Sequence, residues 1–281
     1  MDGTSVSGAA GGDYREISVA PWNPALGAEI GDIDLTRPLP DAQLAELRRA
    51  FVEFQVLFFR DQKIDHDDHA RLAEYFGTIG HHSGRRTNSQ AADDDRVRKF
   101  HASGDEPRVS GNVWHTDQSC NPVPPKASFL YLHTVPGNGG GDTGFASMYG
   151  AYEGLSDRMK TYLEGLTAYH DGVRQFGEGT PCATHPVVVR HPESGRKLLF
   201  VNYGFTTRIN ELPPDESDAV LRFLFDHCRR PEWSTRFRWQ AHSLAMWDNR
   251  CVQHRAIADY LPAVRSGFRV QIDGTEAPVA P

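Results

Sequence analysis

Short apolar runs separated by polar turns recur along most of the chain, and they predict a protein built mainly from β-strands. A run of roughly four to eight apolar or aromatic residues bounded by turn residues is typical of a strand, whereas a helix repeats its apolar positions every three or four residues. The expected strands cover 56–60, 126–135, 185–190, 197–202, 236–242, 244–248 and 267–273. The third and fourth of these flank the sequence HPESG and predict a β-hairpin.

Apolar positions at helical spacing predict a few helices around these strands. Asp41 follows a proline and is expected to cap a helix with the apolar stripe Leu44, Leu47 and Phe51. Helices are also expected over 147–166, with Met148, Tyr152, Leu155, Met159 and Leu163 on one face, and over 213–228.

A further helix is expected after Asp65, which can cap the segment 66–76 before Gly77 ends it. On this helix His66 and His69 are expected on the solvated face.

The pattern indicates one domain over residues 15–276, because no linker and no internal repeat interrupts it. The Gly-, Ser- and Ala-rich residues 1–14 are expected to be a disordered lead-in, and 277–281 a flexible tail. The polar tract 81–110 carries no periodic pattern and is expected to be an active-site loop or lid. Strands that are not separated by regular helices favour a β-sandwich or barrel with flanking helices over βαβ units.

Composition narrows the possible partners. The chain has 281 residues, 39% of them hydrophobic, and a net charge of −7, with no run rich in Lys or Arg, so we expect no nucleic-acid partner. No apolar stretch approaches a membrane span and no secretory signal is present, so no membrane partner is expected. The four cysteines are scattered and no CxxC spacing occurs, which predicts reduced thiols in the cytoplasm.

The sequence VWHTDQSC holds the candidate chemistry. If it ends a strand, His115 and Asp117 project to the same face. With His254 as a third ligand from a distant segment, two imidazoles and one carboxylate would make a facial triad, a set typical of non-heme Fe(II). Arg265 and Arg269 follow at eleven and fifteen positions and could hold a dicarboxylic cosubstrate.

Several segments, taken in order, resemble one known family. They are FFRDQ (58–62), FGTIG (76–80), WHTD (114–117), GGDT (140–143), HPVVVRHPESGRKLLFVNYGFTTRI (185–209) and WDNRCVQHRAIADY (247–260). From about Val19 to Arg269 the chain resembles the TauD/TfdA-like, taurine dioxygenase-type Fe(II)/2-oxoglutarate-dependent oxygenases. The HxD motif alone is weak, but the ordered set is specific.

The resemblance implies a double-stranded β-helix, a cupin-like jelly roll. It implies that His115, Asp117 and His254 hold Fe(II), with O2 as the second cosubstrate. It further implies that Thr143 and Arg265 bind the far carboxylate of 2-oxoglutarate. Family members often form homo-dimers or homo-tetramers.

The resemblance also implies a substrate pocket for a small organic anion such as a sulfonate, sulfate ester or carboxylate. His82, Phe205 and Arg269 match the positions that meet the substrate in the taurine-acting branch. Arg85 and Gly111 stand where that branch has a tyrosine and an asparagine, so taurine itself is in doubt.

Three alternatives remain open at this level. The same machinery could tailor a bulkier natural product by hydroxylation, desaturation or oxidative decarboxylation, which Gly111 and the 81–110 tract would accommodate. A zinc hydrolase could use the same three ligands, but it gives Arg265 and Thr143 no role. A binding module without activity is the third, and the intact triad argues against it.

Overall fold

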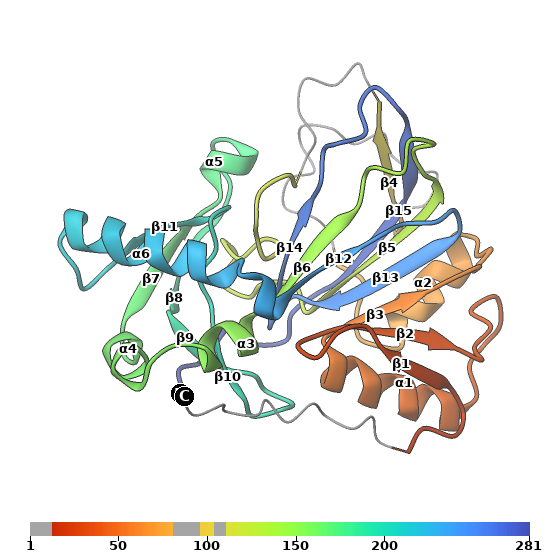
Figure 1. The fold of residues 1–281 in the computed structure, drawn as a ribbon, viewed down its shortest axis with the longest axis horizontal. Helices are drawn as coiled ribbons and strands as arrows, with labels where there is room; N and C mark the ends of the chain where they lie inside the picture. Colours follow the sequence, from red (N-terminus) through yellow and green to blue (C-terminus); the bar gives the residue numbers. More distant parts are fainter. Residues whose placement is uncertain (1–12, 81–95, 104–110) are drawn as a thin grey trace.

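Two β-sheets face each other in the part of the chain that the structure, a computed structural model, describes: residues 13–80, 96–103 and 111–281 (Figure 1). In spatial order, the larger sheet contains β1 (Ser18–Pro21), β2 (Ala28–Gly31), β3 (Val56–Phe59), β13 (Ser243–Asp248), β5 (Ala127–Thr134), β15 (Arg265–Ile272) and β4 (Arg98–Ala102). The facing sheet contains β12 (Ser234–Phe237), β6 (Thr143–Ser147) and β14 (Val252–Ala256). Neighbouring strands are antiparallel except for β2 and β3.

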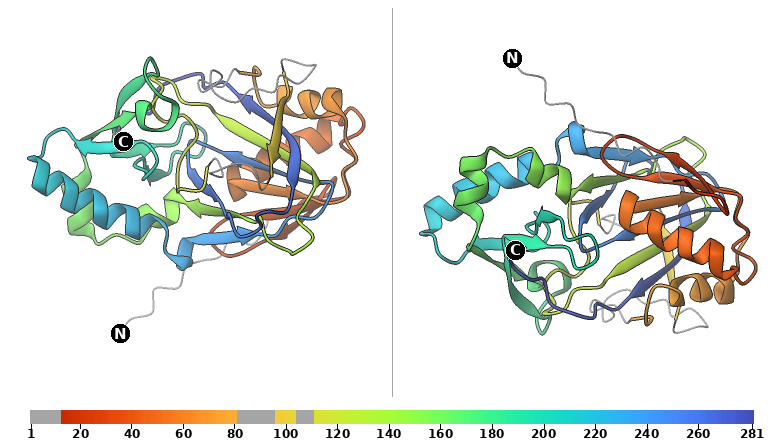
Figure 2. Two further views of the ribbon diagram at one scale, coloured as in Figure 1. Left: turned by 90° about the horizontal axis from the view of Figure 1, so that it is seen from above. Right: turned by 90° about the horizontal axis from the view of Figure 1, so that it is seen from below.

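The other elements form a lobe beside the two sheets and a cover over the larger one (Figures 1 and 2). The lobe holds the three-stranded sheet β11 (Thr206–Ile209), β7 (Thr167–Asp171) and β8 (Cys182–Pro186), and the hairpin of β9 (Val188–Arg190) and β10 (Lys197–Leu199). It also holds the helices α3 (Met148–Glu153), α4 (Asp157–Leu163), α5 (Val173–Phe176) and α6 (Pro214–Cys228), and the 3₁₀ helix η1 (Pro231–Trp233). The cover consists of α1 (Asp41–Phe54) and α2 (His66–Glu74).

The larger sheet is buried on both faces, which is why its strands read as continuous apolar runs. Leu57 and Phe59 of β3 pack outward against α1, whereas Val56 and Phe58 point inward. Phe58 stacks on Phe237 of the facing sheet, with ring centroids 4.1 Å apart. This alternation follows from the two-residue repeat of a strand, and it creates one core between the sheets and a second beneath the helices.

The predicted helix starts are right at one position and wrong at another. Asp65 caps α2, since its side chain accepts a hydrogen bond from the backbone N–H of Asp68 at 2.9 Å. Asp41 is not a cap: it is the first residue of α1, and Pro40 precedes it without a side-chain hydrogen bond. The prediction for His69 is also wrong, because its side chain is buried beneath the larger sheet.

The single helix expected over 147–166 is two helices, α3 and α4, separated by a turn at Gly154–Ser156. Ser156 ends the turn by accepting a hydrogen bond from the backbone N–H of Met159 at 3.3 Å, so the chain restarts as α4. The apolar stripe continues across the break, and periodicity alone therefore could not reveal it.

Two segments near the site depart from expectation. The tract 81–110 was expected to be a loop, but its described part contains the strand β4; residues 81–95 and 104–110 lie outside the described residues. The strand expected to end at Asp117 is reduced to one bridge, in which His115 pairs with His254. The hairpin of β9 and β10 is confirmed.

The chain ends are placed only in part. Of the lead-in 1–14, residues 1–12 lie outside the described residues, and the hydroxyl of Tyr14 donates a hydrogen bond to Glu53 at 2.8 Å. In the tail 277–281, Val279 forms a bridge with Arg190. Flexibility of these ends stays a prediction.

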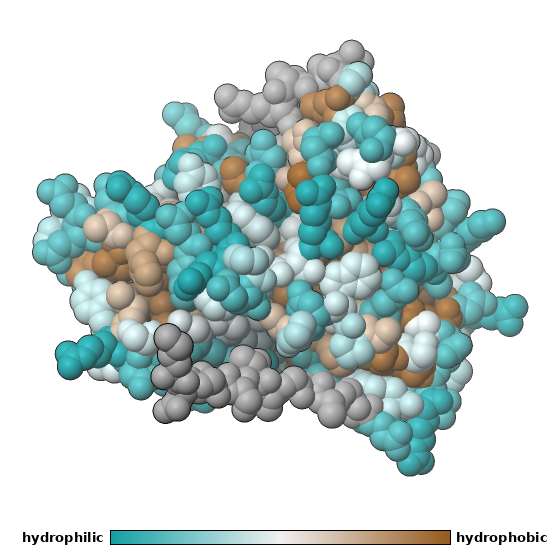
Figure 3. Space-filling model, viewed as in Figure 1, coloured by the Kyte–Doolittle hydropathy of each residue, from teal (hydrophilic) through white to brown (hydrophobic). Residues whose placement is uncertain are grey.

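The surface shown in Figure 3 is mostly hydrophilic, with hydrophobic residues in separate patches. In the ranges given above, no helix has both the length and the apolar character that crossing a bilayer requires. All four cysteines are free thiols, as the sequence predicts.

Candidate metal centre

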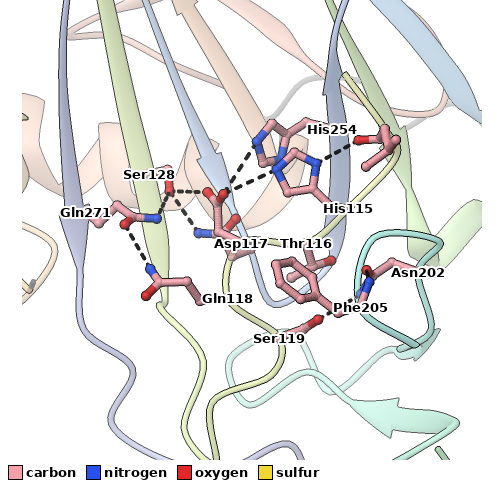
Figure 4. A network of polar contacts seen from close by, with 12 residues as sticks. His115, Thr116, Asp117, Gln118, Ser119, Ser128, Asn202, Phe205, His254 and Gln271 are labelled. Carbon is pink, nitrogen blue, oxygen red and sulfur yellow. Dashed lines mark hydrogen bonds and ion pairs between the residues drawn. The ribbon is translucent and has the colours of Figure 1, made fainter. Parts of the chain in front are cut away.

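Three side chains from distant segments converge between the sheets (Figure 4). His254 lies on β14. Two backbone hydrogen bonds of 2.9 and 3.0 Å pair it with His115, which forms an isolated bridge outside the named strands. The Nε2 atoms of His115 and His254 lie 3.5 and 3.6 Å from Oδ1 of Asp117. The three residues that the HxD motif and its distant partner indicated are therefore brought together.

The orientation of the imidazoles suits a metal ion. Nδ1 of His115 lies 2.7 Å from the carbonyl oxygen of Val113, and a carbonyl only accepts, so this nitrogen carries the hydrogen. Nε2 of His115 is then an acceptor that faces a carboxylate oxygen, an arrangement that repels unless a cation or proton sits between the two. Two imidazoles and one carboxylate suit Fe(II), Mn(II) or Zn(II), so the residues fit the predicted ion.

The second oxygen of Asp117 is fixed by a network from the larger sheet (Figure 4). Ser128 on β5 donates a hydrogen bond to Oδ2 at 2.6 Å, and Nη2 of Arg269 donates to the same oxygen. The amides of Asn249 and Gln271 donate to the Ser128 hydroxyl at 3.0 and 3.1 Å. Oδ1 is thereby left facing the two imidazoles, and the carboxylate cannot rotate without breaking these bonds.

The protonation states are those that metal binding needs. Burial alone would raise the pKa of Asp117, but Arg269 above all, with help from His254, holds the pKa of this carboxyl well below its usual range. Burial, reinforced by neighbouring His115, keeps the pKa of His254 well below its ordinary value. At neutral pH the site therefore presents a carboxylate and a neutral imidazole.

Arg265 is a buried cation without an acidic partner in the described residues. Its side chain is 2% exposed, its Nη2 donates to Oγ1 of Thr143 at 3.3 Å, and its Nε has no hydrogen-bond partner there. Phe100 and Trp239 lie against the guanidinium, at 4.9 and 5.4 Å from ring centroid to Cζ. Burial lowers the pKa of Arg265 to about 10. A buried guanidinium is costly without a counter-charge, so this pocket fits an anion.

The residues expected to meet the substrate are placed in part. The ring of Phe205 lies 6.4 Å from that of His115, and a Cβ added at Gly111 would lie 3.4 Å from Cε1 of His115. Both therefore border the metal centre. Arg269 is nearby, but one side of its guanidinium is bound to Asp117. His82 and Arg85 lie outside the described residues.

Sequence reasoning missed the residues that support the triad. Ser128 and Gln271 lie inside apolar strands and carry no motif, although each is a buried polar residue at a core position, which is the available signal. Asn249 was part of the quoted segment WDNRCVQHRAIADY without being given a role. The role of Val113, which orients His115 through its backbone carbonyl, cannot be predicted from the sequence because every residue type has a carbonyl.

A second cluster, His191, Asp248 and Cys251, also has residue types that bind metals, with their potential ligand atoms within 4.8 Å of one another. Its donors are already used. Nδ1 of His191 accepts from two backbone N–H groups, at 3.1 and 3.3 Å, so Nε2 carries the hydrogen that faces Asp248. Arg250 donates to both oxygens of Asp248 at 2.8 and 2.6 Å. This cluster is a satisfied polar network.

Comparison with known families identifies the class of enzyme. The model of the taurine catabolism dioxygenase TauD, TfdA family matches residues 18–271. The chain belongs to the TauD/TfdA family. It is therefore an oxidoreductase of the Fe(II)- and 2-oxoglutarate-dependent dioxygenases, and the resemblance in its motifs is confirmed.

Curated relatives cover most of the chain. A candidate alpha-ketoglutarate-dependent sulfonate dioxygenase of Schizosaccharomyces pombe is 36% identical over 89% of this TauD/TfdA member and 67% of that protein. An alpha-ketoglutarate-dependent 2,4-dichlorophenoxyacetate dioxygenase of Cupriavidus pinatubonensis is 32% identical over 84% and 90%. An alkylsulfatase of Acinetobacter baylyi is 30% identical over 92% and 86%.

Solved structures share the fold. A taurine dioxygenase from Burkholderia xenovorans superposes with a TM-score of 0.84 at 33% identity, covering 95% of this chain and 92% of that one. The enzyme AAD-2, crystallised with Mn(II) and N-oxalylglycine, superposes with a TM-score of 0.86 at 25% identity, covering 94% and 100%. The predicted jelly roll with flanking helices is thus confirmed.

Proposed function

We propose that this TauD/TfdA enzyme oxidises a C–H bond of a small organic anion, with succinate and CO2 as coproducts. One observation carries the proposal: a His–Asp–His triad and a buried guanidinium that has no acidic partner among the described residues lie between the same two sheets. The triad fits a ferrous ion and the guanidinium fits the far carboxylate of 2-oxoglutarate.

Each residue has a role that follows from its contacts. His115, Asp117 and His254 would hold Fe(II), which with 2-oxoglutarate and O2 supplies the oxidising chemistry. Arg265 would bind the cosubstrate carboxylate, and the hydroxyl of Thr143, which also accepts from Nε1 of Trp239 at 3.0 Å, would add a hydrogen bond. The aromatic walls around Arg265 exclude water and so strengthen this charge pairing.

The substrate is proposed to be a sulfonate, sulfate ester or carboxylate. The named relatives act on sulfonates and on 2,4-dichlorophenoxyacetate, and one is an alkylsulfatase, so an oxyanion is the shared feature. Phe205, Gly111 and Arg269 would border the substrate, because the first two lie beside His115 and the third beside Asp117. His82 and Arg85 stay candidates from the sequence alone.

The test is succinate formation from 2-oxoglutarate with Fe(II) and a panel of organic acids. We expect at least one acid to stimulate it and His115→Ala to abolish it. Arg265→Lys should raise the KM for 2-oxoglutarate roughly tenfold or more, because lysine cannot make the two-pronged contact. Arg229→Lys is the matched control, since its guanidinium binds Asp226 at the surface. Full activity with Zn(II) alone would contradict the proposal.

A second candidate, the tailoring of a bulkier amino-acid-derived substrate, is favoured by Gly111. At φ +76° it leaves open the space beside His115 that a side chain would enter. Gly111→Ala should then impair a bulky substrate more than a small one. Gly165→Ala, at φ +87° with nothing within 4 Å of the added Cβ, controls for backbone strain. Robust sulfite release from taurine would exclude this candidate.

We also propose a cellular location and an oligomeric state for the enzyme. Free cysteines favour the cytoplasm, and the family habit favours a homo-dimer or homo-tetramer. Fractionation of the producing cell and light scattering would test each.

A further inference from the structure

The edge strand β4 carries a basic residue toward the metal centre. β4 lies beside β15 at the edge of the larger sheet (Figure 1). In this antiparallel pair, Arg98 lies opposite Arg269 and Ala102 lies opposite Arg265. Residues directly opposite in such a pair place their side chains on the same face of the sheet. Arg269 and Arg265 point to the interior, so Arg98 belongs to that interior face, whereas Lys99 and His101 belong to the other.

The next residue on that face agrees with this assignment. Phe100, two positions after Arg98, packs against the guanidinium of Arg265. On the opposite face, Nδ1 of His101 lies 2.6 Å from the hydroxyl of Ser266. Arg265, Phe100, Arg269 and Arg98 therefore form a row on the interior face of β15 and β4. Arg98 is exposed and lies at the solvent end of this row.

Positive charge exceeds negative charge along this row. Asp117 is the acidic partner of Arg269, and Asp142 is bound by Arg236 instead of by Arg265. Among the described residues no acidic side chain forms an ion pair with Arg98. Partial loss of solvation and the neighbouring Arg269 both lower the pKa of Arg98, whereas Asp117 raises it, so this guanidinium lies close enough to the metal centre to sense its charges.

We propose that Arg98 binds the anionic group of the substrate, next to Arg269. This inference rests on the proposed function and adds a residue to it. Arg269 can offer a substrate only part of its guanidinium, because its Nη2 donates to Asp117 and to Ser128, the latter at 3.2 Å, while its Nε has no hydrogen-bond partner in the described residues. It positions the metal-binding carboxylate, and Arg98 supplies the donors that an incoming sulfonate, sulfate or carboxylate meets.

The experiment measures binding instead of turnover. The holoenzyme, loaded with Mn(II) and N-oxalylglycine, is titrated calorimetrically with three probes: 2,4-dichlorophenoxyacetate, 1-hexanesulfonate and the neutral 2,4-dichlorophenoxyacetamide. Arg98→Gln and Arg98→Lys are compared with Lys99→Gln, which removes a neighbouring exposed charge from the opposite face of the same strand. Mn(II) affinity is measured in every variant.

We expect Arg98→Gln to weaken the two anions roughly tenfold or more and to leave the neutral amide and Mn(II) unchanged. Arg98→Lys should retain part of the affinity, and Lys99→Gln all of it. Equal losses in Arg98→Gln and Lys99→Gln would overturn the inference, because only net charge would then matter. So would wild-type binding by Arg98→Gln, or failure of both anions to bind the wild type. None of these results bears on succinate formation, so the two proposals can fail separately.

Discussion

The hydroxyl of Ser128 orients the carboxylate of the metal centre. It is fully buried, donates to Asp117, and accepts from the amides of Asn249 and Gln271. Because the carboxylate is tied through it to two strands of the larger sheet, the orientation of Oδ1 depends on the packing of that sheet.

Ser128→Ala should weaken metal binding about tenfold to hundredfold, because outer partners of a ligand have that typical effect. Mn(II) affinity measured by electron paramagnetic resonance would show it. Ser234→Ala, on β12, is the control and should bind as the wild type does. An unchanged affinity in Ser128→Ala would mean that Arg269 alone orients the carboxylate.

Buried histidines predict that the fold weakens in acid. His170 is 0% exposed, and burial lowers its pKa from 6.5 to about 3. Below pH 6.5 the unfolded chain therefore binds a proton at this histidine that the folded chain does not bind. The free energy of unfolding has its full value above that pH and decreases as the pH falls. Between pH 7 and pH 5 this histidine alone should cost about 2 kcal/mol of unfolding free energy.

Urea unfolding at several pH values would check this expectation. His170→Asn should flatten the pH dependence between pH 7 and pH 5, whereas His101→Asn, at an exposed position on β4, should keep the wild-type slope. A slope that is equally steep in all three proteins would assign the acid sensitivity to other groups.

The sequence predicted the triad because its residues carry motifs, and it did not predict the state of Arg269. His115, Asp117 and His254 converge as expected, and Arg265 reaches Thr143. Whether the Arg269 guanidinium faces Asp117 or a ligand depends on a side-chain rotation that no spacing encodes. The role of Arg98 depends on strand register, which is fixed only in the folded sheet.

At the scale of elements, the end of α3 is closely packed against η1. A Cβ at Gly154 would lie 2.6 Å from Cζ3 of Trp233, so the indole of η1 occupies the space that a side chain at this position would need. The segment 147–166 keeps helical periodicity on both sides of this point, and a prediction from periodicity therefore joined two helices into one.

Gly154→Ala should destabilise the fold by about 1–3 kcal/mol, because the added methyl group overpacks the contact with Trp233. Gly137→Ala, with nothing within 4 Å of the added Cβ, should change stability little. Chemical denaturation of both variants gives the comparison. Equal stability of the two would show that the indole can move aside.

Strands that appear as long apolar runs were predicted, whereas strands that mix polar and apolar residues and the fully buried β6, with the sequence TGFAS, were missed. β3, β5 and β13 appear as apolar runs and were expected. β7, with the sequence TAYHD, and β11, with TTRI, mix polar and apolar residues and were missed. Their identity as strands depends on pairing with each other, which is long-range information.

For the whole molecule, metal binding should stabilise the fold, because the ligands come from segments that only the native structure joins. Mn(II) at about 100 times its Kd should add about 2.7 kcal/mol to the free energy of unfolding. The unfolding midpoint should rise in the wild type and stay unchanged in His254→Ala. A rise of equal size in both would indicate binding elsewhere.

The fold class could be predicted from the sequence, but the distribution of the strands among the sheets could not. The many short strands favoured a sandwich or barrel. The jelly roll itself was implied by the ordered motifs that resemble the family. The side lobe of β7, β8, β11 and α6 was not foreseen, because nothing local marks which strands leave the main sheets.

The pairing of β14 with the segment at His115 sets an order of events during synthesis. Asp117 and Arg269, its partner on β15, are 152 positions apart, and His254 also comes from the late part of the chain. A polypeptide still emerging from the ribosome holds only the two-ligand half of the centre. The complete three-ligand site for Fe(II) can therefore form only after the C-terminal strands have folded onto the segment at His115.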